Sequence, residues 1–537
     1  MLRNAFRLHR WGLIGYGVVL FASTYVQAAA FVQIAGTTAA GRAAFARSMT
    51  ALAGQLSYIL PRPFRLDTLD GYVQWRSYGP LALIVMIWAI AAAAGAVRGD
   101  EDRQLVDYWL AARVSRARLV ASRLAAFGLA ALLAAVLGVL GYLAGAAQYE
   151  SVNLGGAAGK MLTLWLLMLT LFALCYLVAQ LIASIRGAQA AGTAVVVALY
   201  LLDVLGRTNH SFDALSWVSP FTWYDATTVL APGGSLDAAG IGLSVAVIAI
   251  AGVLSVLAFA HRDVRGPLFS LPHREVAVKD VTPSPLLAWP VARLLYRQRW
   301  IVAGWGLITA AMAVYMVAIA HSVVDSAINL PGMREFLTHS SGGDPYRGFI
   351  AAFWFGIAQL LLAGFAVHLV SGWAADDTEG ILTSVLSMPV HRWAVIGERA
   401  ATALVGTVVV VAVGSLAAAA MAAAVGTTLD GAAVFRASWL LIPFALTYAA
   451  VGATASANFP RAAVGVLGML AFVSFLVYEL APLLNWPAWA ANLSVQVLYG
   501  TPFLTGVFWN GLWAMLAVVV VGFGLATLLM QRREVGQ

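Results

Sequence analysis

The sequence predicts an all-α polytopic membrane protein whose spanning helices form two similar six-helix halves. The composition supports this class, because 61% of the 537 residues are hydrophobic and only 10% are charged, and the mean hydropathy is +0.84. A soluble domain could not bury so much apolar surface. The second observation is a series of long apolar runs, and the third is a pattern of charged and apolar residues that occurs twice.

The apolar runs are identified by the rule that a helix needs roughly 20 mostly apolar residues to cross a bilayer. Six runs precede residue 261 and six follow residue 300. They cover approximately residues 11–34, 80–97, 119–147, 159–184, 189–205, 236–260, 301–324, 349–372, 395–425, 437–457, 463–484 and 507–531. The first run is long and a second one follows it, which favours a retained spanning helix over a cleaved signal peptide.

The charged residues indicate the topology. The formal net charge is +8, but the cations lie between hydrophobic runs rather than in one patch, so they do not indicate binding of nucleic acid. With both termini in the cytoplasm, most Lys and Arg residues fall in cytoplasmic segments, as the positive-inside rule requires. The single cysteine, Cys175, lies within an apolar run, which excludes a disulfide framework and a cysteine-based metal site within the chain.

A charged amphipathic insert interrupts the apolar runs twice. The first reads GDEDRQLVDYWLAARVSRARLVASR (99–123) and the second ADDTEGILTSVLSMPVHRWAVIGER (375–399). Aligned without a gap at a distance of 276 positions (100 to 376), the inserts share five residues. These pairs are Asp100 and Asp376, Leu110 and Leu386, Val114 and Val390, Arg116 and Arg392, and Arg123 and Arg399.

A second repeated motif extends the duplication to most of the chain. The pattern R-W-x-x-x-G-aromatic-G starts at Arg10 and again at Arg299. We therefore expect a first six-span half at 1–260 and a second at 300–537, in the same orientation and related by a pseudo-two-fold axis along the membrane normal. The density of prolines in residues 261–299 predicts an extended cytoplasmic connector, and the end of this segment is predicted to form an interfacial helix. Residues 39–56 predict an amphipathic helix at the outer face.

The order of residues in each insert has a physical explanation. Asp376, Asp377 and Glu379 crowd the start of the second insert, where the free N–H groups of a helix favour carboxylates. Apolar residues at helical spacing follow, and Pro389 stops the helix. Arginines seven residues apart then lie on one helix face. Such an insert could simply anchor the chain at the lipid headgroups, but two matched copies favour a docking site for a cytoplasmic partner.

At these residues the chain resembles the ABC type 2 permeases, in particular the fused twelve-span exporters of the tetronasin or polyketide-antibiotic type. The family pattern is roughly E-E-x-G-R-x-E-x-L-L-A-x-P-V-S-R. The second insert keeps Glu379, Gly380, Leu386, Pro389, Val390 and Arg392, and the first keeps Asp107, Leu110, Val114, Ser115 and Arg116. Thr383 replaces the later acid of the pattern, while Gln104 and Arg113 replace its glycine and proline in the first insert. Residues 331–345 also resemble the outer loop of that subfamily.

The resemblance implies that the chain is the permease subunit of an ATP-driven exporter of type V architecture in the cytoplasmic membrane of a bacterium. The expected partners are the lipid bilayer, a lipophilic drug or antibiotic as cargo, and two copies of a separate ATP-binding subunit, which carries ATP and Mg²⁺. The chain itself would have no cofactor, metal or catalytic residue and would not be an enzyme. Coupling helices at 99–116 and 375–392 would dock on the subunits through Asp100, Glu101, Asp107, Leu110, Arg116, Asp376, Asp377, Glu379, Gly380, Leu386, Pro389 and Arg392.

No nucleotide site is recognisable in the chain. The nearest match to a phosphate-binding loop contains Gly155, Gly159 and Lys160, but its spacing is one residue short and Met161 replaces the Ser or Thr. We expect this segment to be an outer loop.

Two acids near the ends of apolar runs are candidate pore or gate residues. Asp203 and Glu479 are also 276 positions apart (203 to 479), and a carboxylate in hydrocarbon is costly unless it is paired, protonated or in contact with water. They could line the outer mouth of a pore, or they could be the solvated ends of their helices.

Two other classes of protein remain open. A proton-coupled secondary multidrug transporter of the major-facilitator type would also have twelve spans in two halves of the same orientation, with Asp203 and Glu479 carrying protons. The large inserts and the weakly polar spans argue against it. A membrane-embedded transferase is disfavoured because no loop gathers Asp, Glu and His residues.

Overall fold

The computed structural model describes residues 2–55, 60–147, 149, 152–264, 266, 268, 289–320, 324–325, 344–378, 380–426, 429–483 and 486–533. Within these residues the regular structure is helical, with no strand. Twelve helices are long and apolar enough to span a membrane. The chain divides into two compact units, Met1–Glu275 and Val276–Gln537, and six of the twelve spans lie in each. All-α polytopic membrane architecture is therefore confirmed.

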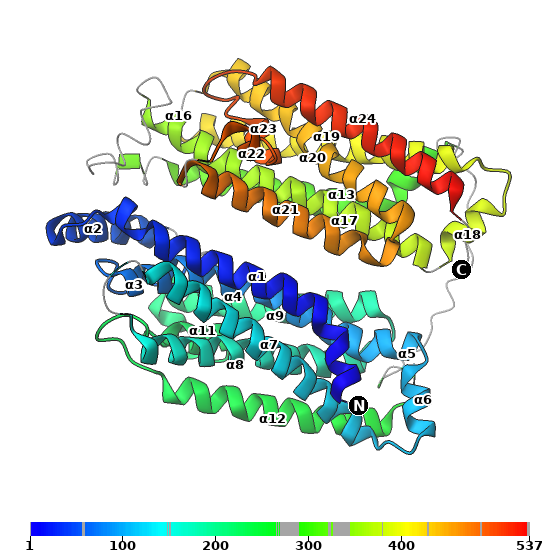
Figure 1. Cartoon of the computed structure of the whole chain (residues 1–537), viewed down its shortest axis with the longest axis horizontal. Helices are drawn as coiled ribbons and strands as arrows, with labels where there is room; N and C mark the ends of the chain where they lie inside the picture. Colours follow the sequence, from blue (N-terminus) through cyan, green and yellow to red (C-terminus); the bar gives the residue numbers. More distant parts are fainter. Residues whose placement is uncertain are drawn as a thin grey trace. The chain divides into compact units, whose positions relative to one another are not determined.

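Unit 1 begins with α1 (Leu2–Ala35), which is followed by α2 (Ala39–Gln55). The second span runs from Leu69 to Asp102 and comprises α3 (Leu69–Val73), a π-helical turn (Gln74–Tyr78), α4 (Gly79–Ala94), another π-helical turn (Gly95–Gly99) and α5 (Asp100–Asp102). The remaining helices are α6 (Leu105–Ala111), α7 (Arg116–Ala146), α8 (Leu154–Leu181), α9 (Ile185–Thr208), α10 (Asp213–Ser216), α11 (Pro220–Ala226) and α12 (Ala238–His261). Figure 1 shows these helices in blue to green.

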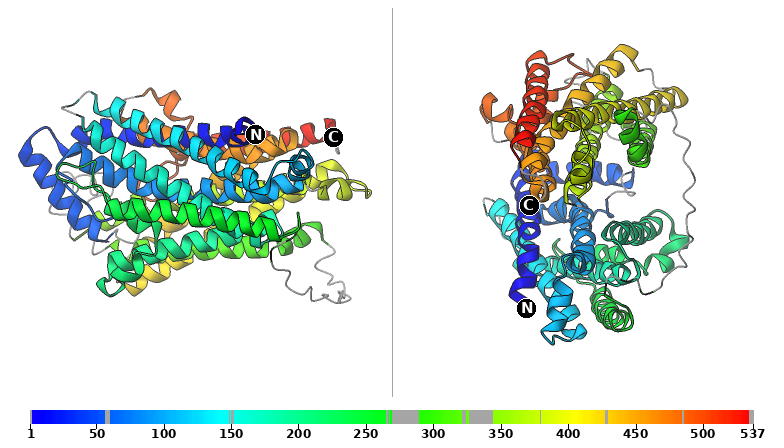
Figure 2. Two further views of the ribbon diagram at one scale, coloured as in Figure 1. Left: turned by 90° about the horizontal axis from the view of Figure 1, so that it is seen from below. Right: turned by 90° about the vertical axis from the view of Figure 1, so that its right-hand side faces the viewer.

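Unit 2 repeats this order. Its long helices are α13 (Pro290–Ala318), α17 (Phe355–Thr378), α19 (Arg392–Ala424), α20 (Gly431–Asn458), α21 (Pro460–Leu483) and α24 (Trp509–Arg532). The shorter helices are α16 (Pro345–Phe349), α18 (Ile381–Leu386), α22 (Ala488–Ala491) and α23 (Val495–Tyr499), and a π-helical turn at Ile350–Trp354 joins α16 to α17. Figure 2 shows from two further sides that the spanning helices within each unit run alongside one another.

Glycines allow the first and third spans of unit 1 to pack closely. A side chain at Gly141 on α7 would place its Cβ 2.1 Å from the carbonyl oxygen of Phe21 on α1. The hydroxyl of Thr24 reaches across this contact and donates to the carbonyl oxygen of Gly138 (2.7 Å). Unit 2 packs α13 on α19 in the same register, because Gly138 faces Leu20 and Gly414 faces Thr309, and both pairs occupy equivalent positions of the repeat (138 to 414, 20 to 309). Small residues at such crossings are typical of helices that associate within membranes.

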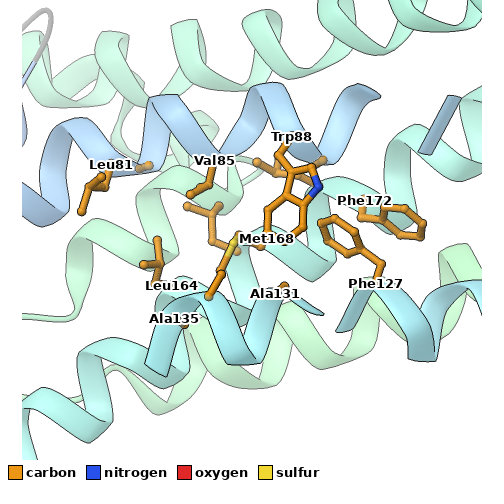
Figure 3. Packing of buried hydrophobic residues seen from close by; sticks show 14 of the residues in the cluster. Leu81, Val85, Trp88, Phe127, Ala131, Ala135, Leu164, Met168 and Phe172 are labelled. Carbon is orange, nitrogen blue, oxygen red and sulfur yellow. The ribbon is translucent and has the colours of Figure 1, made fainter. Parts of the chain in front are cut away.

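Large side chains fill the centre of unit 1. The rings of Phe127 and Phe172 stack at 4.1 Å, and the ring of Trp88 lies 5.1 Å from that of Phe127. These aromatic residues come from α7, α8 and α4, with Val85 and Met168 beside them (Figure 3). This cluster fixes the position of span two, which carries the first insert at its end.

The expected runs all fall on observed spans, with differences at their starts. The second span begins at Leu69, eleven residues before the expected start, because a π-helical turn at Gln74–Tyr78 keeps the helix continuous ahead of Pro80. A following proline is not required for this π-helical turn. A π-helical turn also occurs 276 positions later at Ile350–Trp354 (74 to 350), and no proline follows it.

The residues before span seven that we predicted as an interfacial helix lie in α13, which continues into the span. α13 starts with Pro290, at a position where the missing N–H costs nothing. The interfacial position of its first turns stays a prediction. The amphipathic stretch after α1 is also confirmed as the helix α2. Most of the predicted connector 261–299 and the segment 331–343 lie outside the described residues.

Gly155, Gly159 and Lys160, which we expected in a loop, lie in helix. α8 begins at Leu154 because the side-chain oxygen of Asn153 accepts from the backbone N–H of Gly156 (2.8 Å) and so caps the helix. The loop prediction was wrong because glycines suggested a turn, whereas here they let α8 pack closely on the segment around Val229.

Candidate functional site

Each insert folds as a short helix that a left-handed residue separates from the preceding span. Gln104 has φ = 59° before α6, and Gly380 has φ = 78° before α18. The two residues occupy equivalent positions of the repeat. Glycine adopts this conformation at little cost, whereas a residue with a side chain pays about 1 kcal/mol. Gln104 nevertheless adopts the left-handed conformation, so the first insert keeps the turn without a glycine, at this small cost.

The short helices and the turns after them expose apolar side chains between the second and third spans of each unit. Val106 of α6 and Leu382 of α18, again 276 positions apart (106 to 382), are buried against their own units. The side chains of Tyr108 on α6 and of Met388, two residues after the end of α18, are 68% and 51% exposed. Of the other predicted contact residues, Asp107 and Pro389 are exposed, Leu110, Leu386 and Gly380 are half-buried, and Glu379 lies outside the described residues.

The two acids at the start of the first insert point into unit 1. Asp100 and Glu101 are each 1% exposed. Asp100 forms an ion pair with Arg123 of α7. Glu101 accepts from Arg98 (2.7 Å) and also forms an ion pair with Arg262, which lies just after α12. Neither carboxylate lies on the surface that a partner could touch, so their placement gives them an internal, structural task.

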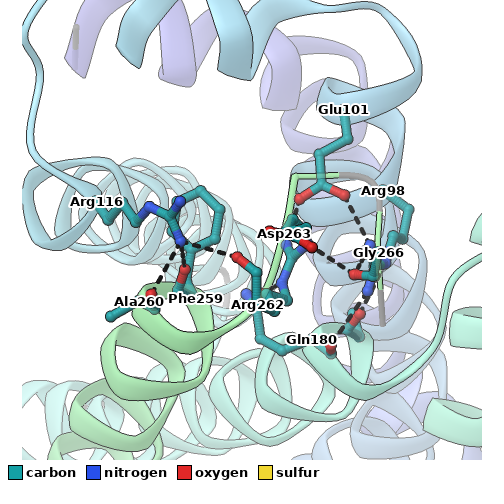
Figure 4. A network of polar contacts seen from close by, with 10 residues as sticks. Arg98, Glu101, Arg116, Gln180, Phe259, Ala260, Arg262, Asp263 and Gly266 are labelled. Atoms are coloured by element: carbon teal, nitrogen blue, oxygen red, sulfur yellow. Dashed lines mark hydrogen bonds and ion pairs between the residues drawn. The ribbon is translucent and has the colours of Figure 1, made fainter. Parts of the chain in front are cut away.

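Arg98 ties this network to the rest of unit 1 (Figure 4). It donates to the carbonyl oxygens of Ala179 (3.0 Å), Gln180 (3.1 Å) and Gly266 (3.2 Å). The side-chain oxygen of Gln180 in turn accepts from Arg262 (2.8 Å). Two guanidinium groups thus share one carboxylate and several carbonyl oxygens, which is the compensation that buried charges require.

The arginine at the end of each insert binds the last carbonyl oxygens of the final span in its unit. Arg116 donates to the carbonyls of Phe259, Ala260 (3.2 Å) and Arg262 (2.9 Å) at the end of α12. Helix ends leave such carbonyls without partners inside the helix and carry partial negative charge, so a cation is favourable there.

Unit 2 makes the same contacts in the same register. Arg392 donates to the carbonyls of Met530 (2.9 Å), Gln531 (3.2 Å) and Arg533 (2.5 Å), each 271 positions after its counterpart in unit 1 (259 to 530). Asp377 forms an ion pair with Arg533, as Glu101 does with Arg262. We call Glu101, Arg116, Arg262 and the end of α12 the clasp of unit 1. Asp377, Arg392, Arg533 and the end of α24 form the clasp of unit 2.

The two clasps differ in burial. The side chains of Glu101 and Arg262 are 1% exposed, whereas those of Asp377 and Arg533 are 10% and 20% exposed. Ala374 stands at the position equivalent to Arg98. Asp376 forms its ion pair with Arg297 of α13, and Arg399 donates to the carbonyl of Trp373 (3.3 Å).

The sequence interpretation missed Arg262 and Arg533. A signal for them existed, because each arginine is followed by an acid, Asp263 and Glu534, at the same distance of 271 positions (262 to 533). The repeat thus extends past the final span of each half.

Asp203 belongs to a polar network in unit 1. It is 2% exposed, forms an ion pair with Arg207 (2.7 Å) and accepts from Thr222 (3.0 Å). Arg207 and Asp225 both interact electrostatically with it, and a cleft of about 410 Å³ opens beside all three. Glu479, its counterpart in the sequence, lies exposed on α21 of unit 2. The structure gives the two acids different environments, and their pore role stays a prediction.

Asp225 makes the stability of this network depend on pH. Burial, with the neighbouring Asp203, raises the pKa of Asp225 from 3.8 to about 7, against the opposing influence of Arg207 and Lys160. The folded chain therefore holds this proton more tightly than the unfolded chain, so the stabilisation is complete below pH 3.8 and is lost as the pH rises toward about 7. We expect Asp225→Asn to reduce the fall in melting temperature between about pH 5 and about pH 7.5, measured in detergent.

Asp213 provides the control for this experiment. It lines the same cleft, but its side chain is 57% exposed beside His210. Asp213→Asn should leave the pH dependence of the melting temperature as in the wild type. Equal effects of the two substitutions would contradict the assignment to Asp225.

Two protein families match the chain. Residues 7–264 match the ABC-2 family transporter proteins, and residues 287–530 match the C-terminal domain of the multidrug efflux system permease Rv1217c. A search of curated proteins gives no match. Each matched range lies within one structural unit and contains one insert. With its twelve candidate spans and duplicated inserts, the chain belongs to the ABC-2 family of transporter proteins.

Proposed function

We propose that this permease is the membrane-spanning subunit of an ATP-driven exporter, and that α6 and α18 each dock on one copy of a separate ATP-binding subunit. The observation that carries the proposal is the pair of short helices, held in the same register in both units, with exposed apolar side chains. Exposed aromatic and methionine side chains among charges are typical of protein interfaces. The partner subunits would supply the ATP and Mg²⁺ site.

The inserts would face the cytoplasm of a bacterial cell, where ATP is available. The distribution of Lys and Arg supports this orientation, with both termini on the cytoplasmic side. Lipophilic drugs or antibiotics are the proposed cargo, because the second half is similar to a permease of a multidrug efflux system. Asp203 is engaged with Arg207 and Thr222, which disfavours the alternative of proton coupling through this acid.

Purification of the tagged chain from its native membranes tests the proposal. We expect an ATP-binding protein with a G-x-x-x-x-G-K-[ST] loop to copurify, in two copies per chain, and its ATP hydrolysis to rise when the chain is present. If no such subunit binds, or if the purified chain alone transports a lipophilic dye with a proton gradient, the proposal is wrong.

Substitutions in the two inserts, on α6 and just after α18, should weaken the docking. Tyr108→Asp and Met388→Asp place a charge in the apolar part of the proposed interface, so we expect each to lower the affinity for the ATP-binding subunit about tenfold. Leu154→Asp is the matched control, because Leu154 is 65% exposed at the opposite end of α8 from the insert. Titration of the labelled ATP-binding subunit onto the chain in nanodiscs measures the affinity. An equal effect of the control would exclude α6 and α18 as the docking sites.

A further inference from the structure

The contacts that join each insert to the last span of its unit are more extensive than docking requires. Arg116 and Arg392 each donate to three backbone carbonyls at the end of α12 and α24. The ion pair of an insert acid with the arginine after the helix adds a second contact in each unit. Neither contact touches the exposed faces of α6 and α18, so docking alone does not explain why both recur in the same register.

The helices held by the clasps bury only a small share of their apolar surface within their units. Within the chain, 28% of the apolar window of α12 and 17% of that of α24 are buried, values that α9, α13 and α21 also show, compared with 72% for α20. Apolar packing therefore resists displacement of α12 and α24 less than displacement of α20. Hydrogen bonds from a cation to helix carbonyls are about twice as strong as neutral ones. In each unit three carbonyl oxygens share the two N–H groups of one arginine Nη1. The clasp is a concentrated polar attachment at the end of a helix whose apolar surface is largely exposed within its unit.

We propose that the clasps transmit the motion of the inserts to the last span of each unit, so that α12 and α24 are the helices that ATP-driven docking displaces. This inference rests on the proposed function. Arg116 and Arg392 are positioning residues: they carry displacement from the insert to the helix end and do not contact the ATP-binding subunit. The guanidinium binds backbone atoms at a helix terminus, so the contact has a fixed place on the helix. Displacement of the insert would therefore move the helix as a rigid body.

The unequal burial of the clasps gives them different tasks. Arg98 and Gln180 complete a buried network around Glu101 and Arg262, and such a network does not open without leaving charges unpaired. The clasp of unit 2 lacks the counterpart of Arg98 and is partly exposed to solvent. Salt and water weaken a pair of this kind. The clasp of unit 1 is a permanent link, and that of unit 2 is the one that opens and closes.

A charge exchange in unit 2 tests the proposal. Asp377→Arg and Arg533→Asp are introduced singly and together into the full chain, which is reconstituted in nanodiscs with its ATP-binding subunit. Each single variant should keep the affinity for the subunit within about twofold but reduce the stimulation of ATP hydrolysis about tenfold, the range of typical coupling between sites. The double variant restores an ion pair and should recover most of the stimulation.

Two control variants separate this result from changes of charge or folding. Arg532→Asp makes the same charge change at an exposed neighbouring position and should retain the stimulation. Arg533→Gln removes the ion pair without reversing the charge, and should reduce the stimulation if Arg533→Asp does not fold. Melting temperatures of all variants are measured in parallel, so that a loss of stimulation is compared among equally stable chains.

The possible outcomes are distinct. Loss of subunit affinity in the single variants without recovery in the double variant would make Asp377 a docking residue and overturn the proposal. Unchanged stimulation in folded single variants would overturn it as well, because the clasp would then be structural only. If the wild-type chain binds no ATP-binding subunit, the proposed function itself fails, and the inference fails with it.

Discussion

Replacing Glu101 by glutamine is expected to lower the free energy of unfolding of the permease by about 3–5 kcal/mol, because the substitution leaves buried cations without their counter-charge. Arg98 and Arg262 both depend on this one carboxylate, and the side chains of all three residues are 1% exposed. Their remaining partners are carbonyl and amide oxygens, which satisfy hydrogen bonds but carry no net charge. Denaturant or thermal unfolding in detergent measures the loss.

The adjacent residue supplies the matched control. Asp102 is exposed, so Asp102→Asn removes the same charge from the same helix end and should cost less than about 0.5 kcal/mol. In unit 2, Asp377→Asn should cost about 1 kcal/mol or less, because its ion pair is partly solvated. If Glu101→Gln costs no more than Asp102→Asn, the charge of Glu101 does not stabilise the fold.

Replacing Gly141 by alanine is expected to destabilise unit 1 by about 3 kcal/mol, and replacement by valine should prevent folding, because α1 and α7 would have to separate. The added Cβ would lie 2.1 Å from the carbonyl oxygen of Phe21 and 2.5 Å from the hydroxyl oxygen of Thr24. The first of these atoms belongs to the backbone and cannot rotate away. The hydrogen bond from Thr24 to Gly138 would break in the same displacement.

Gly15 on α1 is the matched control for Gly141. No atom lies within 4 Å of a Cβ added there, so Gly15→Ala should be neutral or slightly stabilising, since alanine favours helix over glycine. Size-exclusion profiles and melting temperatures in detergent compare the two variants. A similar result for both would mean that the contact between α1 and α7 tolerates an added methyl group, which contradicts close packing at Gly141.

The spans could be predicted from the sequence because their signal is local. A run such as residues 437–457 contains enough apolar residues to cross a bilayer, and no partner is needed to recognise it. The inserts could also be predicted from the sequence, since only 10% of the residues are charged and the inserts contain clusters of them. The family resemblance was carried by the same residues, and the family matches confirm it.

The placement of the acids could not be predicted, because it depends on residues distant in the sequence. Glu101 is buried only because Arg262, 161 positions away, reaches it. Asp203 and Glu479 look equivalent in the repeat, but Arg207 and Thr222 enclose the first while the second lies exposed on α21. Periodicity identifies a helix face, but it does not say what packs against that face.

The π-helical turns have a further consequence for the angular phase of the second span in each unit. Such a turn takes up one extra residue, and one residue corresponds to about 100° of rotation around a helix. Unit 1 has a turn at Gly95–Gly99, directly before Asp100, while the equivalent stretch of unit 2 is regular α-helix. Asp100 and Asp376 therefore leave their helices in different directions, and they bind arginines of different spans, Arg123 on α7 and Arg297 on α13. Restoring regular helix in unit 1 would rotate Asp100 away from Arg123. Both copies keep the same acid, and a difference in helix winding therefore sets the arginine that each acid binds.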